Sequence, residues 1–331
     1  MDALGTTALT KHYGRREPPV HLPIGHSGGV VRALDDLTIA VREGEIFGFL
    51  GPNGAGKSTT IRLLLGYLHP TSGSAEVLGL DIVRDSVAIR ARIGYLPGGI
   101  ALYDSLTGED LLDYLGALTG RPSTRRAELT DRLEMSGRTL QRTVRDYSRG
   151  MRQKIGIIQA LQHDPELAIL DEPTEGLDPL MQRAFYDLLD DLKAAGRTIF
   201  FSSHVLSEVE RVCDRVAIVR RGRLVALEDV ASLLERRKRN VEIRAADGDM
   251  PALEGVPGVS SIGRTADGRL TCQLEGDVGP FLQAIAGHRI TDLTIEPAHL
   301  EEAFLELYED AEPDDGSPQP SPTPAAPAGV P

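Results

Sequence analysis

The sequence predicts an α/β protein in which a parallel sheet is covered by helices and is followed by a smaller α+β domain. The first observation is a set of short, continuously apolar runs, which are typical of strands buried on both faces. The second is helical periodicity between those runs. The third is a change to shorter alternating segments, separated by Gly and Pro, in the last third of the chain. The apolar runs lie at residues 45–50, 167–170, 198–201 and 216–219.

Composition and charge narrow the class of protein. The 331 residues include 36 Lys or Arg and 49 Asp or Glu, and the formal net charge is −13. Phosphate neutralisation over a broad surface needs clustered Lys and Arg, so we expect no nucleic-acid partner. No run approaches the ~18 apolar residues that a spanning helix needs, and no basic segment precedes an apolar one at the start. The expected chain is soluble and cytoplasmic, with two reduced cysteines.

An unusual segment near the start, residues 15–30, is rich in Pro, Gly and His and lies between two strand-like stretches. This composition predicts a flexible surface insertion. His21 and His26 lack other ligand-type residues at useful spacing, and the loop interpretation is therefore favoured over a metal site.

The strand predicted at residues 45–50 runs into a glycine-rich loop followed by a helical segment. The loop fits the pattern G-x-x-x-x-G-K-S/T in its required context of strand before and helix after. Its glycines let backbone N–H groups turn toward phosphate oxygens, Lys57 supplies a charge to the β and γ phosphates, and Ser58 offers a hydroxyl to Mg²⁺. The predicted nucleotide-binding residues are Gly51, Pro52, Asn53, Gly54, Ala55, Gly56, Lys57, Ser58 and Thr59.

Polar residues follow two further predicted strands. The strand at 167–170 ends in Asp171 and Glu172, where ligands of open α/β sheets bind. Asp171 is placed to hold Mg²⁺, usually through water, and Glu172 to polarise the attacking water as general base. The strand at 198–201 leads to His204, which can hydrogen-bond the γ-phosphate or that water. Together with Lys57 of the loop, these residues predict a nucleotide-hydrolysing site.

The segment that decides between kinds of phosphate-loop enzyme is Tyr-Ser-Arg-Gly-Met at residues 147–151, just before a helical pattern. It resembles the signature of the ATP-binding cassette (ABC) family, usually L-S-G-G-Q, and keeps the serine and the second glycine. Residues 171–179, D-E-P-T-E-G-L-D-P, then resemble the family's catalytic strand end and D-loop. His204 matches the family's switch histidine. The resemblance implies a cassette domain with a helical signature subdomain that binds ATP and Mg²⁺.

This resemblance also assigns residues that no single motif would. Tyr13 matches the aromatic that stacks on adenine in the family. The signature implies that Ser148 and Gly150 cap the γ-phosphate held by a second cassette, and Asp178 would lie across that interface. By itself Ser148 would be interpreted as a helix N-cap. Because the chain has one set of motifs, two copies, or one copy and a paralogue, would clamp two ATP molecules.

One position departs from the family pattern. A glutamine normally follows the strand that here reads R-I-G-Y-L-P at residues 92–97, and its side chain reaches Mg²⁺ and the attacking water. This chain has Gly98 there. Glycine has no side chain to coordinate anything, so we expect water or a nearby group to complete the Mg²⁺ shell, with hydrolysis retained.

Three segments resemble the ATP-binding subunits of bacterial ABC-2-type exporters: residues 95–103, the signature, and L-E-E-A-F-L at 300–305. The resemblance implies a separate integral-membrane permease as partner, docked on the surface of residues 81–113, and drug or antibiotic efflux as the transport class. The chain would then lie in the cytoplasm, peripheral on the inner face of the cell membrane.

Two other classes of function fit the sequence less well than export does. A soluble cassette ATPase that acts on a macromolecular partner such as ribosomes or DNA usually carries two cassettes, a long coiled coil or basic extensions. None of these is visible, although this alternative stays open. A GTPase or small-molecule kinase would leave the signature unexplained, and no Asn-Lys-x-Asp guanine-specificity motif occurs.

The predicted domains follow from the change in pattern. We expect a cassette at residues 1–232, a small α+β accessory domain at 233–310, and a disordered Pro-rich tail at 311–331. The accessory domain should contain short strands at 241–244, 270–274 and 291–295. Two helices are expected in it, at 278–286 and 299–308.

Overall fold

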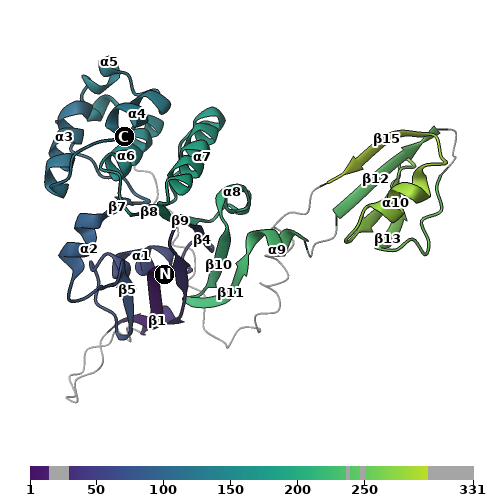
Figure 1. Ribbon diagram of the computed structural model, residues 1–331, viewed down its shortest axis with the longest axis horizontal. Coiled ribbons are helices and arrows are strands. Elements are labelled where there is room, and N and C mark those ends of the chain that lie inside the picture. Colours follow the sequence, from purple (N-terminus) through teal and green to yellow (C-terminus); the bar gives the residue numbers. More distant parts are fainter. Residues whose placement is uncertain (15–29, 236–238, 247–249, 297–331) are drawn as a thin grey trace, which may run out of the picture.

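The computed structural model describes residues 1–14, 30–235, 239–246 and 250–296 (Figure 1). Nearly all of the predicted insertion, the helix predicted at 299–308 and the predicted tail lie outside these residues. The described part contains three sheets, of six, five and four strands. No helix in this part has the length and apolar character needed to cross a bilayer.

The six-stranded sheet is the parallel sheet that the sequence predicts. Its strand order is β11-β10-β4-β9-β8-β7, and every neighbouring pair is parallel except β10 and β11. All residues of β4, β8 and β9 are buried, as expected of strands covered on both faces. The strands are β4 (Ile46–Leu50), β7 (Ile93–Leu96), β8 (Leu167–Asp171), β9 (Thr198–Ser203), β10 (Arg215–Arg220) and β11 (Arg223–Asp229).

Successive residues of β4 enter two different cores, because side chains alternate across a strand. Ile46 and Leu50 pack with α7 and α8 on one face of the sheet. Phe47 and Phe49 pack with α1 and the five-stranded sheet on the other. This two-sided cover confirms the predicted α/β class. Apart from the helices between β7 and β8, the helices described before residue 236 are α1 (Lys57–Leu64), α2 (Ser86–Arg92), α7 (Pro179–Ala194), α8 (Leu206–Val212) and α9 (Val230–Glu235).

The five-stranded sheet is antiparallel, and its pairing was not predicted. Its order is β2-β1-β5-β6, with β3 paired to β1. The two strand-like stretches expected on either side of residues 15–30 are its strands β1 and β2. Register shifts interrupt the pairing, and β5 buries only two of its six residues, so β5 has no clean alternation in the sequence. The strands are β1 (Asp2–Tyr13), β2 (Val31–Leu37), β3 (Ala40–Arg42), β5 (Ser72–Val77) and β6 (Leu80–Asp81).

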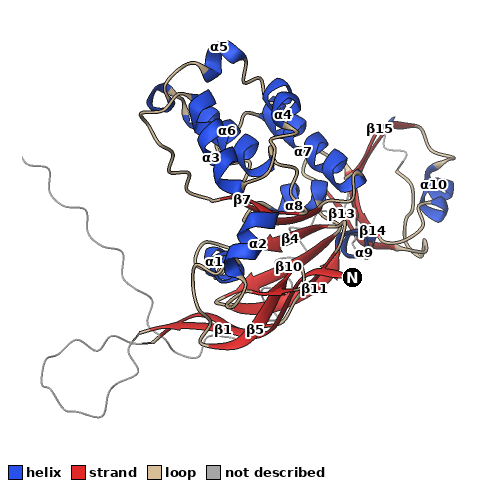
Figure 2. Ribbon diagram, turned by 60° about the vertical axis from the view of Figure 1, so that its left-hand side comes forward, coloured by secondary structure: helices blue, strands red, loops and turns tan. Residues whose placement is uncertain are grey.

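A group of helices between β7 and β8 in the sequence forms the predicted helical subdomain, which lies beside one end of the parallel sheet in both ribbon views (Figures 1 and 2). Its buried residues include Leu111, Leu129, Ile155 and Ile158. Figure 2 shows how these helices gather together. They are α3 (Gly108–Thr119), α4 (Arg126–Arg132), α5 (Gly137–Leu140) and α6 (Arg149–Leu161), with a 3₁₀ turn, η1 (Val144–Asp146), before α6.

The C-terminal described residues form a separate antiparallel sheet of order β13-β14-β12-β15 with one helix, α10. It has its own core, which includes Val241, Ile243, Leu274 and Phe281. The strands and the helix expected between residues 241 and 295 are present, and β13, with its polar Ser-Ser-Gly sequence, was not predicted. The elements are β12 (Arg239–Ala245), β13 (Val259–Arg264), β14 (Leu270–Leu274), α10 (Gly279–Ile285) and β15 (Ile290–Ile295).

Candidate nucleotide-binding site

The glycine-rich loop between β4 and α1 has a backbone that other residues could not follow. A Cβ on Gly51 would lie 2.5 Å from the carbonyl oxygen of Val219. Gly56, the residue before α1, has a φ of 106°, and a Cβ on it would lie 2.5 Å from the carbonyl oxygen of Ala33. Both glycines are therefore required by close backbone approach. The loop is a tight cradle that ends at a helix N-terminus.

Lys57 places a buried cation in this cradle. Its side chain is only 5% exposed, and Nζ donates to the carbonyl oxygens of Gly51, at 2.6 Å, and of Pro52, at 3.4 Å. The same nitrogen lies 3.5 Å from Glu172 Oε1. A buried ammonium is costly unless it is hydrogen-bonded or paired, so these contacts hold the charge inside the loop. The arrangement suits a polyphosphate ligand, which needs backbone N–H groups and one strong cation.

Three oxygen-bearing side chains meet below the loop. Ser58 Oγ donates to Asp171 Oδ2 at 3.1 Å, and Ser202 Oγ donates to Asp171 Oδ1 at 2.9 Å. Mg²⁺ is usually bound by one or two such side chains together with phosphate oxygens and water. The residues present therefore fit Mg²⁺, with Ser58 and Asp171 as its predicted ligands. Ser202 was not predicted, because its role depends on the neighbouring strand and no motif marks it.

Glu172, directly after β8, has a strained backbone. Its φ is 50°, in the left-handed region that residues other than glycine rarely adopt. The backbone N–H donates to the carbonyl of Ser202 at 3.0 Å, which fixes this conformation. His204 Nδ1 lies 3.0 Å from Glu172 Oε1. The carboxylate is thus held between a histidine and the Lys57 cation.

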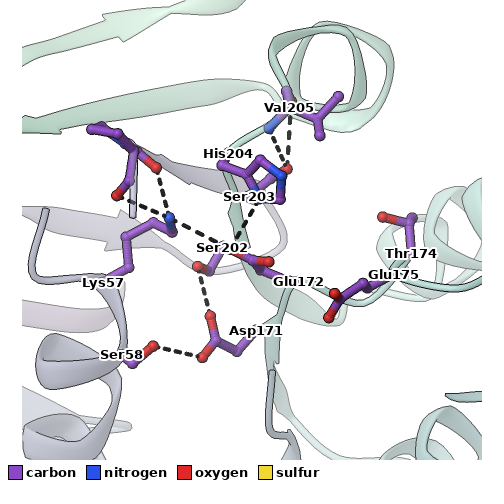
Figure 3. A network of polar contacts seen from close by, with 12 residues as sticks. Lys57, Ser58, Asp171, Glu172, Thr174, Glu175, Ser202, Ser203, His204 and Val205 are labelled. Atoms are coloured by element: carbon purple, nitrogen blue, oxygen red, sulfur yellow. Dashed lines mark hydrogen bonds and ion pairs between the residues drawn. The ribbon is translucent and has the colours of Figure 1, made fainter. Parts of the chain in front are cut away.

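Figure 3 shows these side chains converging from three segments: the loop and α1, the end of β8, and the end of β9. Five predicted residues come together in this network, since each is within 3.5 Å of another. They are Lys57, Ser58, Asp171, Glu172 and His204. Such a set can bind a phosphate chain and a divalent cation. The Glu172 carboxylate would then stand beside them as a hydrogen-bond acceptor.

The signature residues occupy the start of α6. Ser148 is the N-cap and accepts a hydrogen bond from the N–H of Met151 at 3.2 Å. Gly150 fits closely, since a Cβ there would lie 2.8 Å from the carbonyl oxygen of Gly176. Asp178 is likewise the N-cap of α7 and accepts from Leu180 and Met181 N–H groups at 3.0 Å. Within this chain both polar side chains therefore have a capping role.

Helix α6 is also tied to the segment around Glu172. Gln153 Nε2 donates to the carbonyl oxygens of Pro173, at 2.7 Å, and of Glu172, at 3.4 Å. Arg149 forms an ion pair with Glu175. These contacts join α6 to the backbone around Glu172. Sequence reasoning missed Gln153, because its partners are main-chain atoms about 20 residues away.

Tyr13 ends β1 near the loop. It pairs with Val31 of β2, and Ala33, two residues along the same strand, provides the carbonyl that approaches Gly56. The ring is 38% exposed, with the Lys11 ammonium 5.3 Å from its centroid. Tyr13 is therefore partly exposed, and the Lys11 ammonium lies over its ring.

Gly98, the position that departs from the family pattern, lies against Asp171. A Cβ at Gly98 would be 3.1 Å from Asp171 Oδ2, which is tighter than an ordinary contact. Burial, and after it the Asp171 charge, raises the pKa of the Tyr95 phenol to about 12. A side chain at position 98 would therefore require the Asp171 carboxylate to shift.

Comparisons with known proteins agree with this geometry. The sequence model of the ABC transporter family matches residues 34–175. An uncharacterised ABC transporter ATP-binding protein of Nostoc sp. is 38% identical over 83% of this chain and 83% of its own length. The daunorubicin resistance ATP-binding protein DrrA3 of Streptomyces coeruleorubidus is 34% identical over 85% of this chain and 93% of its own. A solved ATP-binding subunit of an ABC transporter, 30% identical, superposes with a TM-score of 0.59 over 70% of this chain and 91% of that one.

Proposed function

This chain belongs to the ABC transporter ATP-binding proteins, and on that premise we propose that it hydrolyses ATP to energise export through a separate ABC-2-type membrane permease. The observation that carries the proposal is the convergence of Lys57, Ser58, Asp171, Glu172 and His204 in one network. The name of its relative DrrA3, a daunorubicin resistance protein, supports drug or antibiotic efflux as the transport class.

Binding of ATP is assigned to the loop of residues 51–59 and to Tyr13. The loop N–H groups and the N-terminus of α1 meet the phosphates, and the Lys57 ammonium exchanges its carbonyl contacts for the β and γ phosphate oxygens. The exposed ring of Tyr13 stacks on the adenine. Ser58 and Asp171 would hold Mg²⁺, which would neutralise charge on the phosphates.

Hydrolysis is assigned to Glu172 and His204. Glu172 accepts the proton of the attacking water, since its carboxylate stands beside the Lys57 end of the phosphate loop. His204, 3.0 Å from that carboxylate, orients it and hydrogen-bonds the γ-phosphate or the water. The left-handed backbone of Glu172 aims the carboxylate into the site.

We assign the remaining predicted residues to pairing between two cassettes. The N–H groups at the start of α6, presented by Ser148 and Gly150, face the γ-phosphate on a second copy of the chain or on a paralogue. Asp178, at the start of α7, lies across the same interface. Their capping roles within the chain are compatible with this, because a capped helix leaves its other N–H groups free for an anion.

The permease partner is assigned to the surface of residues 81–113, which carries exposed side chains such as Val87 and Tyr103. The chain would then be cytoplasmic and peripheral on the inner face of the membrane. We assign residues 1–232 to the cassette and 233–310 to an accessory domain that stabilises the pair or regulates its opening. Detergent extraction of a polytopic membrane protein together with the tagged chain would support this assignment, whereas recovery of ribosomes or DNA alone would contradict it.

The pairing is tested with Glu172→Gln, which should bind ATP without hydrolysing it. Light scattering should give twice the mass of one chain with ATP and Mg²⁺ and the mass of one chain with ADP. Adding Ser148→Ala should weaken the pair, while adding Thr107→Ala, which removes the N-cap of α3 instead, should not. A mass that stays at one chain with saturating ATP, or an equal loss in both double variants, would contradict the assignment.

A further inference from the structure

A buried carboxylate outside the catalytic network lies behind it. Glu208, in the short helix α8 that follows His204, is only 8% exposed. A buried carboxylate is costly unless its oxygens are hydrogen-bonded, and each oxygen of Glu208 has a hydroxyl donor. Thr174 Oγ1 donates to Oε1, and Ser203 Oγ donates to Oε2 at 2.7 Å.

The two donors come from the two segments that carry the catalytic residues. Thr174 is two residues after Glu172, and it is 6% exposed. Ser203 is the residue before His204, and it is 1% exposed. Ser203 Oγ also accepts a hydrogen bond at 2.9 Å from the N–H of Val205, so one hydroxyl holds the backbone on both sides of the histidine.

The charge of Glu208 also acts on α7, the helix capped by Asp178. Burial, and after it the Glu208 charge, raises the pKa of the Tyr186 phenol on this helix to about 12. The hydrogen bonds of the Glu208 carboxylate thus connect the segment after β8 with the end of β9.

We propose that Glu208 is a positioning residue for hydrolysis, which sets the distance between Glu172 and His204 by binding Thr174 and Ser203 with its two carboxylate oxygens. The proposal rests on the proposed function, in which Glu172 is the general base. Hydrogen bonds to an ionised carboxylate are short and strong, so this link is stiffer than a neutral one. In this proposal Glu208 acts only through Thr174 and Ser203, in the two segments that carry Glu172 and His204.

Positioning has a kinetic signature that simple destabilisation lacks. Lys57 is held by the carbonyl oxygens of Gly51 and Pro52, which belong to the loop itself, and the loop meets the Glu208 link only through the long 3.4 Å bond from Gly51 N–H to the Ser203 carbonyl. Binding of ATP should therefore be largely preserved when the link is broken. The Glu172 to His204 contact should loosen, and an error of about 1 Å in such geometry can lower a rate by about a hundredfold. The expected result is a fall in kcat with little change in KM.

The experiment compares three variants of the full chain by steady-state ATP hydrolysis and thermal unfolding. Thr174→Val keeps the shape of the side chain but removes its hydroxyl, Thr174→Ser retains the hydroxyl, and Glu208→Gln removes the charge. Thr6→Val is the control, because Thr6 is equally buried and hydrogen-bonded but lies in β1.

We expect Thr174→Val and Glu208→Gln to lower kcat by about tenfold to a hundredfold, with KM for ATP within about twofold of the wild type. Thr174→Ser should keep the kcat of the wild type. A double variant that combines Thr174→Val with Glu208→Gln should have a kcat no lower than the lower of the two single variants. An unchanged kcat in Thr174→Val would overturn the proposal. So would a fall in kcat no larger than the one that Thr6→Val shows, if both variants lose the same amount of Tm. A wild-type chain that releases no phosphate would instead contradict the proposed function itself.

Discussion

Glu172 and Gly98, on opposite sides of Asp171 in the sequence, show how single residues shape the site. Glu172 adopts a φ of 50°, which costs about 1–2 kcal/mol for a residue with a side chain. The N–H bond to the carbonyl of Ser202 and the contact from Gln153 hold it there. Gly98 acts through what it lacks: without a Cβ, it leaves the Asp171 carboxylate in place.

The first prediction concerns Gly98. In Gly98→Ala the new Cβ lies 3.1 Å from Asp171 Oδ2, so the carboxylate must shift against its hydrogen bonds from Ser58 and Ser202. We expect the Mg²⁺ concentration for half-maximal ATP hydrolysis to rise roughly tenfold, as is usual when a metal ligand's surroundings change. Gly99→Ala is the matched control, because nothing lies within 4 Å of a Cβ at Gly99. Equal Mg²⁺ dependence in both variants would contradict the prediction.

Among the helices and strands, the fully buried strands could be predicted best. The strands β4, β8 and β9 are buried at every residue, and their apolar runs marked them in the sequence along with the motif residues at their ends. In the antiparallel sheet the strand-like stretches that became β1 and β2 were recognised, but their pairing was not, because its register shifts between residues.

The same reasoning explains which site residues were missed. Lys57, Asp171 and His204 were predicted, because each belongs to a motif or follows a buried strand directly. Gln153 and Glu208 were missed, because their roles depend on atoms that the fold brings close from segments remote in the sequence. Local patterns contain no information on such contacts.

The second prediction concerns the start of α7. Removing an N-cap side chain usually costs about 1 kcal/mol, so Asp178→Ala should lower Tm by roughly 2–4 °C. Asp178→Asn should be nearly as stable as the wild type, since an amide oxygen can also accept from the N–H groups of Leu180 and Met181. If Asp178 also acts across a cassette pair, Asp178→Asn should still weaken ATP-dependent pairing. Loss of stability in Asp178→Asn equal to that in Asp178→Ala would contradict the capping role.

The third prediction belongs to the whole molecule and concerns alkaline pH. Burial raises the pKa of Tyr186 to about 12, so folding favours the neutral phenol over the ionised one. A raised pKa contributes stability that is complete below the unfolded value, near 10, and is lost as pH rises toward 12. The stability advantage of the wild type over Tyr186→Phe should therefore shrink between pH 9 and pH 12 in urea denaturation. A difference between the two chains that stays constant over this range would contradict the prediction.

The acidic charge of the whole chain and its anion site are compatible. The net charge is −13, yet the Lys57 ammonium and the backbone N–H groups confine positive potential to one loop. The polyphosphate site is therefore local, and its chemistry depends on two loops meeting at Glu172 and His204. Hydrolysis by this network is the central claim.

The most direct test is the Mg²⁺-dependent release of phosphate from ATP by the purified full chain, measured beside Glu172→Gln. General-base catalysis contributes about 10²–10⁴-fold to a rate, so Glu172→Gln should lose at least about a hundredfold in kcat while still binding ATP. A wild-type chain that releases no phosphate, or a Glu172→Gln variant as active as the wild type, would contradict the claim.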